Sequence, residues 1–320
     1  MDKQIVGRFA PSPSGRMHLG NVLCALLAWL SVRSRDGKYI LRIEDLDPDR
    51  CPRHYADLIE DDLRWLGLDW DEGGSIGGPD GSYYQSERTE IYQHYFDILQ
   101  EKGLIYPCFC SRAALHAASA PHLSDGRVIY AGTCRDMTPE EIGAAMKKRK
   151  PAARLRVPDR TVEYMDGVQG IYREHLPTEC GDYIIRRSDG VFGYQLAVVV
   201  DDALEGVNEV VRGCDLISSA PRQIWLHEVL GFEPPAFYHM PLLCASDGRR
   251  LSKRDEDLDL GLLRQKFTPE QIVGALAHAA GLIDRPEPVA AKELAAGFRW
   301  EQVPKGDLFL PSFLTGEQNA

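Results

Sequence analysis

Residues 5–43 restrict the fold more than any other part of the chain. Residues 5–9 read as a short buried strand, and the prolines and glycine at 11–15 exclude a helix there. Apolar residues recur every three or four positions over Leu19–Arg33, which predicts a largely buried helix. A second strand follows at 39–43. A strand, a crossover helix and a second strand form a βαβ unit, which implies a parallel sheet.

Periodicity and capping residues predict the later elements. Helices are expected over residues 53–66 and 219–230, and two more begin after N-terminal caps at Thr138 and Thr268. The apolar, β-branched run at 196–200 predicts a central parallel strand. These signals describe one α/β sheet whose two halves are separated by a segment of different character.

Composition narrows the class of protein. The 320 residues are 44% hydrophobic and 27% charged, which excludes a disordered chain. The longest apolar run has nine residues, whereas a membrane helix needs about 20, and the N-terminus lacks the apolar core of a secretory signal. We therefore expect a cytoplasmic protein without a membrane partner.

Charge narrows the class of partner. The net charge of −11 excludes a general basic coat for nucleic acid and leaves only local patches. One such patch is KKRK at 147–150. It either complements the C-terminus of the preceding helix or contacts RNA, and the sequence does not choose between these roles.

Two segments carry residues suited to phosphate chemistry. In the first, at 8–21, His18 stands at the start of a helix whose N-terminal N–H groups favour phosphate, with Gly20 permitting close approach. By itself His18 is equally well explained as a capping or core histidine. In the second, at 249–254, four cations in six residues ordinarily mark a solvated surface. Opposite a helix N-terminus, however, Lys253 would clamp a triphosphate.

A cysteine cluster suggests a metal site. Three thiols lie within 27 residues, at Cys108, Cys110 and Cys134. Such clustering favours Zn²⁺ over reduced core cysteines, although a C-x-C pair is not the common finger spacing. The fourth ligand is His116, His122 or Tyr130. Chemistry alone favours a histidine, because a phenol has a pKa near 10.

Taken together, the motifs resemble class I aminoacyl-tRNA synthetases. HLGN at 18–21 resembles the HIGH signature, with Leu for Ile and Asn for the final His. RLSKR at 250–254 resembles KMSKS, with Arg, Leu and Arg in place of the first Lys, Met and final Ser. The glutamyl branch is resembled by RFAPSPSGRMHLGN, LRIEDLD at 41–47, GYQLAVVVDD at 193–202 and EVVRG at 209–213. The resemblance extends over residues 4–260.

Length selects within that branch. The chain ends about 65 residues after the lysine loop, too few for the anticodon-binding region of a full glutamyl-tRNA synthetase. The pattern resembles the glutamyl-Q tRNA(Asp) synthetase family. That resemblance implies tRNA-independent activation of L-glutamate by ATP, and then transfer of glutamate to queuosine at the wobble position of tRNA(Asp).

The resemblance also implies roles for individual residues. Glutamate would be held by Arg8, Phe9, Ala10, Pro11, Ser12, Glu44, Tyr194 and Arg212. ATP would be held by His18, Gly20, Asn21 and Lys253, of which His18 and Lys253 are the catalytic pair. One structural Zn²⁺ would be held by Cys108, Cys110, Tyr130 and Cys134. Mg²⁺ would accompany ATP, and Asp201 and Asp202 are either Mg²⁺ or ribose contacts or solvated acids at a strand end.

The implied fold is the Rossmann-like parallel sheet of a class I catalytic core, with a zinc-containing insertion and a small helical C-terminal part. Residues 1–105 and 181–240 would form the two halves of the catalytic domain. Residues 106–180 would form the inserted module, and 241–320 the lysine loop and helical region. We expect a monomer.

Three other functions compete with this one. A minimal glutamyl-tRNA synthetase would charge the 3′ end of tRNA. A HIGH-type nucleotidyltransferase would make a small cofactor, but the RFAPS, Tyr194 and Arg212 set provides an amino-acid pocket. A non-catalytic paralogue would bind RNA or adenylate and regulate.

Overall fold

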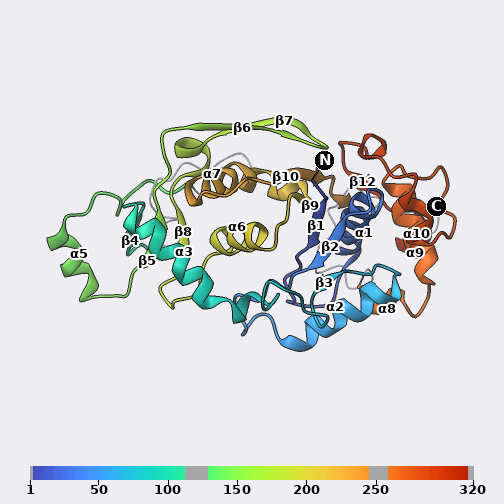
Figure 1. Ribbon diagram of the computed structural model, residues 1–320, viewed down its shortest axis with the longest axis horizontal. Coiled ribbons are helices and arrows are strands. Elements are labelled where there is room, and N and C mark those ends of the chain that lie inside the picture. The colour runs from blue at the N-terminus through green and yellow to red at the C-terminus, as the bar shows by residue number, and fades with distance from the viewer. Residues whose placement is uncertain (1–2, 112–128, 245–258, 316–320) are drawn as a thin grey trace.

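The computed structural model describes residues 3–111, 129–244 and 259–315. At its centre lies a parallel sheet (Figure 1), in which the βαβ unit predicted from the sequence is present, with β1 and β2 paired in parallel. Its five strands run in the spatial order β10 (Ala236–Met240), β9 (Glu209–Gly213), β1 (Val6–Phe9), β2 (Lys38–Leu41) and β3 (Glu72–Gly73). The α/β class with a parallel sheet is confirmed.

Helices cover both faces of this sheet (Figure 1). The core on one face includes residues of α1 (Leu19–Arg33), α2 (Arg53–Trp65) and α9 (Pro269–Ala279), and the core on the other includes residues of α3 (Thr89–Glu101), α6 (Tyr194–Leu204) and α7 (Ala220–Leu230). Successive strand residues enter different cores. Tyr39 and Leu41 belong to the α1 side and Ile40 to the α6 side. Alternation of side chains along a strand explains this split.

One predicted element is wrong. Residues 196–200 form no strand and lie within helix α6, between α3 and α7. All residues from Leu196 to Asp202 are buried. A helix that is buried on every side needs apolar residues all round, so its sequence resembles that of a central strand.

The segment between the two halves of the sheet has its own strands. An antiparallel sheet contains β4 (Ile105–Cys108), β5 (Ala152–Leu155) and β8 (Tyr183–Arg186), and a hairpin is formed by β6 (Thr161–Asp166) and β7 (Gly170–His175). Helix α5 (Pro139–Met146) begins with the predicted Thr138 capping box and buries no residue. In Figure 1, α5 lies at one end of the molecule, while the hairpin lies along β10.

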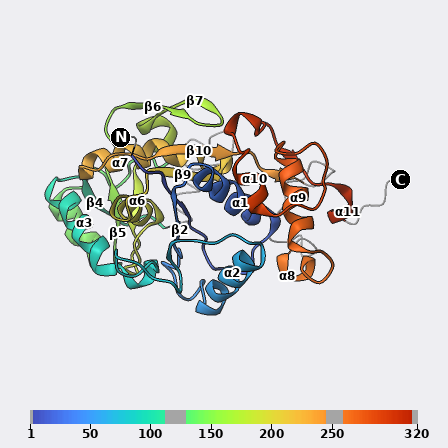
Figure 2. The same ribbon diagram turned by 45° about the vertical axis from the view of Figure 1, so that its right-hand side comes forward.

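The C-terminal residues pack against α1, although their sequence shows little pattern after 285 (Figure 2). Trp300 stacks on Tyr238 and donates a hydrogen bond from Nε1 to Ser31 Oγ at 2.8 Å. The remaining elements are α8 (Leu260–Leu263), α10 (Ala291–Ala295), α11 (Ser312–Thr315), the parallel pair β11 (Leu243–Cys244) and β12 (Leu308–Phe309), and the short turns η1 (Gln85–Glu87), η2 (Leu176–Cys180), η3 (Cys214–Ser219) and η5 (Trp300–Gln302).

Within the described ranges, no helix combines the length and apolar character needed to cross a membrane.

Candidate active site

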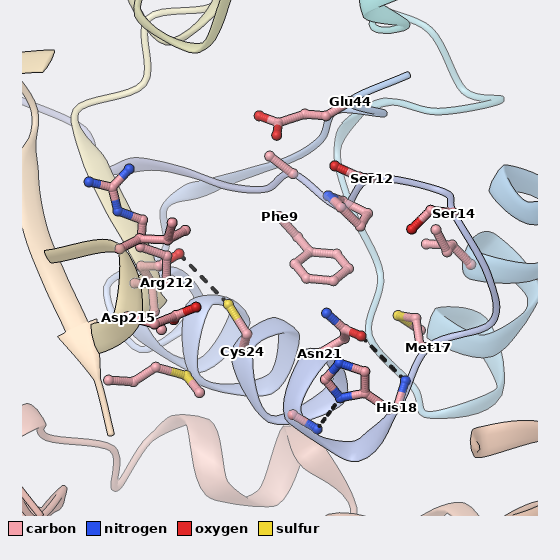
Figure 3. Close-up of a pocket in the computed structure, with 18 of the residues that line it drawn as sticks. Phe9, Ser12, Ser14, Met17, His18, Asn21, Cys24, Glu44, Arg212 and Asp215 are labelled. Carbon is pink, nitrogen blue, oxygen red and sulfur yellow. Dashed lines mark hydrogen bonds between the residues drawn. The ribbon is translucent and has the colours of Figure 1, made fainter. Parts of the chain in front are cut away.

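A cavity of about 510 Å³ opens where β1 and β9 end and α1 begins. All the residues predicted for glutamate or ATP that the structure describes line this one cavity: Arg8, Phe9, Ala10, Pro11, Ser12, His18, Gly20, Asn21, Glu44, Tyr194 and Arg212. Figure 3 labels six of them, Phe9, Ser12, His18, Asn21, Glu44 and Arg212. Ligands of open α/β sheets bind at this edge, so the fold itself brings these residues together from four separate stretches of sequence.

His18 both caps helix α1 and lines the cavity. Its Nδ1 accepts a hydrogen bond from the backbone N–H of Gly20 at 3.1 Å, and Asn21 Oδ1 accepts from the N–H of His18 at 3.3 Å (Figure 3). A ring whose Nδ1 accepts carries its proton on Nε2, which makes the Nε2 side a donor. A Cβ on Gly20 would lie 2.9 Å from His18 Cε1, so only glycine leaves this ring in place.

Arg212 and Tyr194 lie together on the β9 side of the cavity. The Nη1 group of Arg212 donates to Gln223 Oε1 at 2.8 Å and to the Tyr194 hydroxyl at 3.4 Å. Its Nη2 is buried without a hydrogen-bond partner among the described residues. A buried guanidinium with an unused donor at a cavity wall is suited to a carboxylate ligand.

Arg8 and Glu44 supply a second positive group and a negative group. Arg8 donates to the carbonyl of Val211 at 3.0 Å and lies 3.5 Å from Asp202. Burial raises the pKa of Glu44 to about 7, although the charges of Arg42 and Arg8 oppose this rise. The cavity therefore offers cationic groups and one carboxyl whose charge changes near neutral pH.

Asp201 and Asp202 have neither of the roles considered from the sequence. They lie on helix α6, are buried, and do not line the cavity. Asp201 accepts from Arg88 Nε at 2.7 Å, and Asp202 accepts from Arg42 Nη2 at 2.6 Å. Asp201 also accepts from Gln85 and Tyr92, so both acids are buried ion-pair partners away from the cavity and are neither Mg²⁺ or ribose contacts nor solvated acids. The correction follows from that of α6, since a strand would have ended at these residues.

The described residues that flank the lysine loop lie at the α1 end of the cavity. Leu243 lines the cavity, and Asp259 forms a β-bridge with His18. Lys253 itself lies outside the described residues.

Sequence reasoning missed several residues that line the cavity, among them Cys24, Asp215, Met240 and Leu242. Asp215 follows two residues after the EVVRG motif, and that proximity was an available signal. Cys24 lies on α1, Met240 on β10 and Leu242 between β10 and β11, and none of them belongs to a motif. Sequence reasoning also missed His239, whose ring contacts Arg212.

The three predicted thiols converge in a second site, away from the cavity. The Sγ atoms of Cys108, Cys110 and Cys134 all lie within 4.8 Å of one another. The Cys110 and Cys134 sulfurs are 3.7 Å apart, and the hydroxyl oxygen of Tyr130 lies 3.7 and 3.9 Å from the sulfurs of Cys108 and Cys110. Zinc–sulfur bonds of about 2.3 Å in a tetrahedron give ligand separations of about 3.8 Å, so the spacing fits such an ion.

Arg154 links this cluster to the antiparallel sheet. Its Nε lies 3.1 Å from Cys108 Sγ, and its guanidinium carbon lies 3.6 Å from the centroid of the Tyr130 ring. Burial opposes ionisation of Cys108, but hydrogen bonding and charge from Arg154 bring the thiol pKa below its ordinary value. The thiolate, which is the form that binds metal, is thereby favoured. His116 and His122, the alternative fourth ligands, lie outside the described residues.

Comparison with known proteins places the chain in a family. The family described as tRNA synthetases class I (E and Q), catalytic domain, matches residues 4–281. The chain belongs to this class I tRNA synthetase family. Glutamyl-Q tRNA(Asp) synthetases from Symbiobacterium thermophilum and Nitratidesulfovibrio vulgaris are 50% and 48% identical to it, each over 96% of both chains. The resemblance to glutamyl-Q tRNA(Asp) synthetases is thus confirmed over nearly the whole chain, and the chain is a ligase-type enzyme.

A solved structure supports the same assignment to class I tRNA synthetases. The chain is similar to a glutamate tRNA ligase from Elizabethkingia meningosepticum that was crystallised in complex with its amino acid, with a TM-score of 0.84 and 27% identity. The match covers 98% of this chain and 68% of that one.

Proposed function

We propose that this chain activates L-glutamate with ATP and transfers the glutamyl group to queuosine at the wobble position of tRNA(Asp). One observation carries the proposal: the buried arginines and the capped α1 N-terminus face the same cavity. An amino acid held by the arginines would present its α-carboxylate to a nucleotide phosphate held at the helix start. The residue-level similarity to glutamyl-Q tRNA(Asp) synthetases supports the choice of acceptor.

The chemistry needs no nucleophile from the protein. An α-carboxylate oxygen of glutamate attacks the α-phosphate of ATP, forming glutamyl-adenylate as the bond to pyrophosphate breaks. A hydroxyl of the queuosine cyclopentene diol then attacks the activated carbonyl, and AMP leaves. Positioning and charge stabilisation therefore account for catalysis.

At the glutamate end, we assign Arg8 and Arg212 to the carboxylates and Glu44 to the ammonium group. Tyr194 and Ser12 would add hydrogen bonds. The remaining members of the glutamate set, Phe9, Ala10 and Pro11, would shape the cavity wall. Two buried cations and one acid match the two carboxylates and one ammonium of glutamate.

At the ATP end, His18 would donate from Nε2 to a phosphate oxygen, with Gly20 and Asn21 at the helix start. Lys253 would approach from the opposite side and stabilise charge that develops on the α-phosphate and the leaving pyrophosphate. Mg²⁺ would enter with ATP and neutralise charge on its phosphates.

We propose that Cys108, Cys110, Tyr130 and Cys134 hold one structural Zn²⁺. The separations of these side-chain atoms support this set, and Tyr130 fills the corner for which a histidine was the chemical alternative. Metal analysis of purified protein should give one zinc per chain. Cys134→Ser should remove it. Less than about one-tenth of a zinc ion per chain in the wild type would refute the site.

The zinc-bearing insertion at 106–180 would meet the RNA, between catalytic halves at 1–105 and 181–240 and a C-terminal part at 241–320. The basic run at 147–150 is exposed and makes no ion pair within the described parts of the chain, which supports an RNA contact over a purely local role. We propose a cytoplasmic monomer.

The test has two arms. Exchange of labelled pyrophosphate into ATP should require glutamate and proceed without tRNA. Labelled glutamate should then transfer to a tRNA pool that contains queuosine, and to none that lacks it. Equal labelling of both pools would indicate 3′-end charging. Absence of exchange and transfer, with ATP still bound, would indicate a regulatory paralogue.

A further inference from the structure

We propose that His239 and Asp166 are positioning residues that hold the Arg212 guanidinium in the orientation needed to bind glutamate. The inference rests on the proposed function, since Arg212 is there assigned to a glutamate carboxylate. Neither His239 nor Asp166 lines the cavity, and no sequence motif connects them.

The three side chains form a buried series of hydrogen bonds. Arg212 Nε lies 2.9 Å from His239 Nε2, and His239 Nδ1 lies 2.5 Å from Asp166 Oδ2. All three residues are buried. An arginine Nε–H only donates, so His239 Nε2 must accept, and the imidazole proton must be on Nδ1, where it donates to Asp166. The partners thereby define one tautomer of His239.

Asp166 is itself held by the backbone. Its Oδ1 accepts from the N–H groups of Val168, Gln169 and His239, at 3.0, 2.9 and 3.2 Å. Burial alone would raise the pKa of Asp166, but hydrogen bonds from His239 and Gln169 bring it below its ordinary range. Burial lowers the pKa of His239. A charged Asp166 therefore faces a neutral imidazole, which is the arrangement that the tautomer requires.

The other atoms of the guanidinium show what this series leaves for a ligand. Nη1 is bonded to Gln223 and Tyr194, whereas Nη2 has no partner among the described residues. The Phe237 ring lies 5.1 Å from the Arg212 guanidinium carbon and stacks on His239 with an angle of 12° between planes. The Nε and Nη1 donors and one face of the guanidinium are thus occupied. The donor that remains, Nη2, belongs to a residue that lines the cavity.

The series also connects two parts of the chain. Asp166 ends β6 in the inserted segment, while Arg212 and His239 lie on β9 and β10 of the central sheet (Figure 1). Next to Asp166, Gly167 donates to the carbonyl of Phe237 at 2.8 Å. A Cβ on Gly167 would lie 2.0 Å from the Tyr238 ring. The turn after β6 is therefore seated directly on β10, which sets where the Asp166 carboxylate lies.

Asp166→Asn tests the tautomer with little change of shape. The carboxamide can keep its oxygen on the backbone N–H groups, which turns its NH₂ group toward His239 Nδ1. The imidazole proton then moves to Nε2. His239 Nε2–H and Arg212 Nε–H are then both donors that face each other, so the hydrogen bond between them is lost. Since a hydrogen bond to a charged group is lost, we expect the KM for glutamate to rise roughly 10- to 100-fold. The KM for ATP and the kcat at saturating glutamate should change less than about threefold.

His239→Gln distinguishes positioning from a merely structural contact. Glutamine has no ring tautomer, so no proton shift can turn its carbonyl, which accepts from Arg212, into a donor; its NH₂ group then faces residue 166. In this background Asp166→Asn should raise the KM for glutamate by less than about threefold, so the two changes should be strongly non-additive. A purely structural pair would lower the melting temperature and raise both KM values together.

The chain offers a matched control in the same segment. His175 Nε2 lies 2.9 Å from Asp159 Oδ1 in a pair that is exposed. Asp159→Asn therefore removes a similar His–Asp contact from a site that is far less buried. This variant should leave the KM for glutamate unchanged.

Nitrogen NMR of the His239 ring decides the inference without an activity assay. The wild type should show a protonated Nδ1 and Asp166→Asn a protonated Nε2. A protonated Nε2 in the wild type would overturn the inference, as would normal glutamate KM in an active Asp166→Asn enzyme. A wild type that lacks glutamate-dependent exchange would instead refute the proposed function, and the ring spectrum would still decide the tautomer.

Discussion

Buried charges in the cavity are bonded to several elements of the fold, whereas the cations of the basic run at 147–150 are exposed. Arg8 and Arg212 are buried and bonded to residues of other elements, Arg8 to Val211 on β9 and Arg212 to Gln223 on α7. Residues 147–150 are exposed and, in the described ranges, make no ion pair, and helix α5 before them buries no residue.

This difference suggests two ways to recognise charge. In the cavity, the fold holds donors in place before a ligand arrives, which favours selection of one small molecule. In the basic run, exposed side chains can adjust to a phosphate backbone, which favours affinity over selectivity. The cysteine cluster adjoins this basic run through β5, because Ala152 pairs with Cys108. A metal bound by these cysteines would hold in place β5, the strand into which the basic run leads.

The strongest test of the cavity is Lys253→Ala. If Lys253 stabilises charge that exists only in the transition state, kcat for pyrophosphate exchange should fall roughly 100- to 1000-fold. The KM for glutamate should stay within about threefold of wild type. Steady-state exchange kinetics measure both, and an equal effect on kcat and glutamate binding would remove the transition-state role.

Arg212→Ala should mainly affect glutamate binding, whereas Lys253→Ala should mainly affect kcat. Loss of a buried cation from a carboxylate site should weaken glutamate binding about 100-fold, with a smaller effect on ATP binding. Calorimetric titration with glutamate measures this directly. Unchanged affinity would mean that the carboxylate lies elsewhere in the cavity.

Cys134→Ser should separate the two regions. If zinc orders only the inserted segment, transfer to queuosine-containing tRNA should fall about tenfold or more, because structural zinc contributes folding free energy to the region it holds. Glutamate-dependent exchange without tRNA should be little changed. Parallel loss of exchange would show that the cavity depends on the cluster, and Cys51→Ser is a control outside it.

The pH dependence of kcat/KM for glutamate should report Glu44. Its pKa is raised to about 7, so the carboxylate needed for the ammonium group is lost as pH falls through 7. From pH 8 to pH 6, kcat/KM at saturating ATP should fall about tenfold. Glu44→Gln should have low activity without this slope, and a persistent slope in that variant would assign the titration to another group.

The smallest effect is expected at the basic run. Lys148→Ala with Lys150→Ala should raise the KM for tRNA severalfold and flatten its dependence on salt by about one logarithmic unit per lost phosphate contact. Glutamate activation should not change. Lys102→Ala, at an exposed lysine directly after α3, is the matched control. Equal salt slopes in all variants would mean that the run only complements helix α5.

Local sequence determined much of what positions the cavity. The βαβ unit and the caps at Thr138 and Thr268 were predictable, because capping and alternation act between near neighbours. The H-x-G pattern at 18–20 is equally local, since Gly20 makes room for the His18 ring that caps the same helix. Among the three candidates for the fourth metal ligand, Tyr130 was preferred only through family resemblance, since residue chemistry favoured a histidine.

Tertiary structure decided the rest, because burial and partners across the fold are not written in adjacent residues. Residues 196–200 form a helix where a strand was expected. The sequence did not distinguish the two, because an element buried on all sides needs apolar residues in either conformation. Asp201 and Asp202 became ion-pair partners once that helix turned them toward Arg88 and Arg42. Asp166 and His239 are 73 positions apart, and only the seating of a hairpin on β10 brings them within hydrogen-bonding distance of each other and of Arg212.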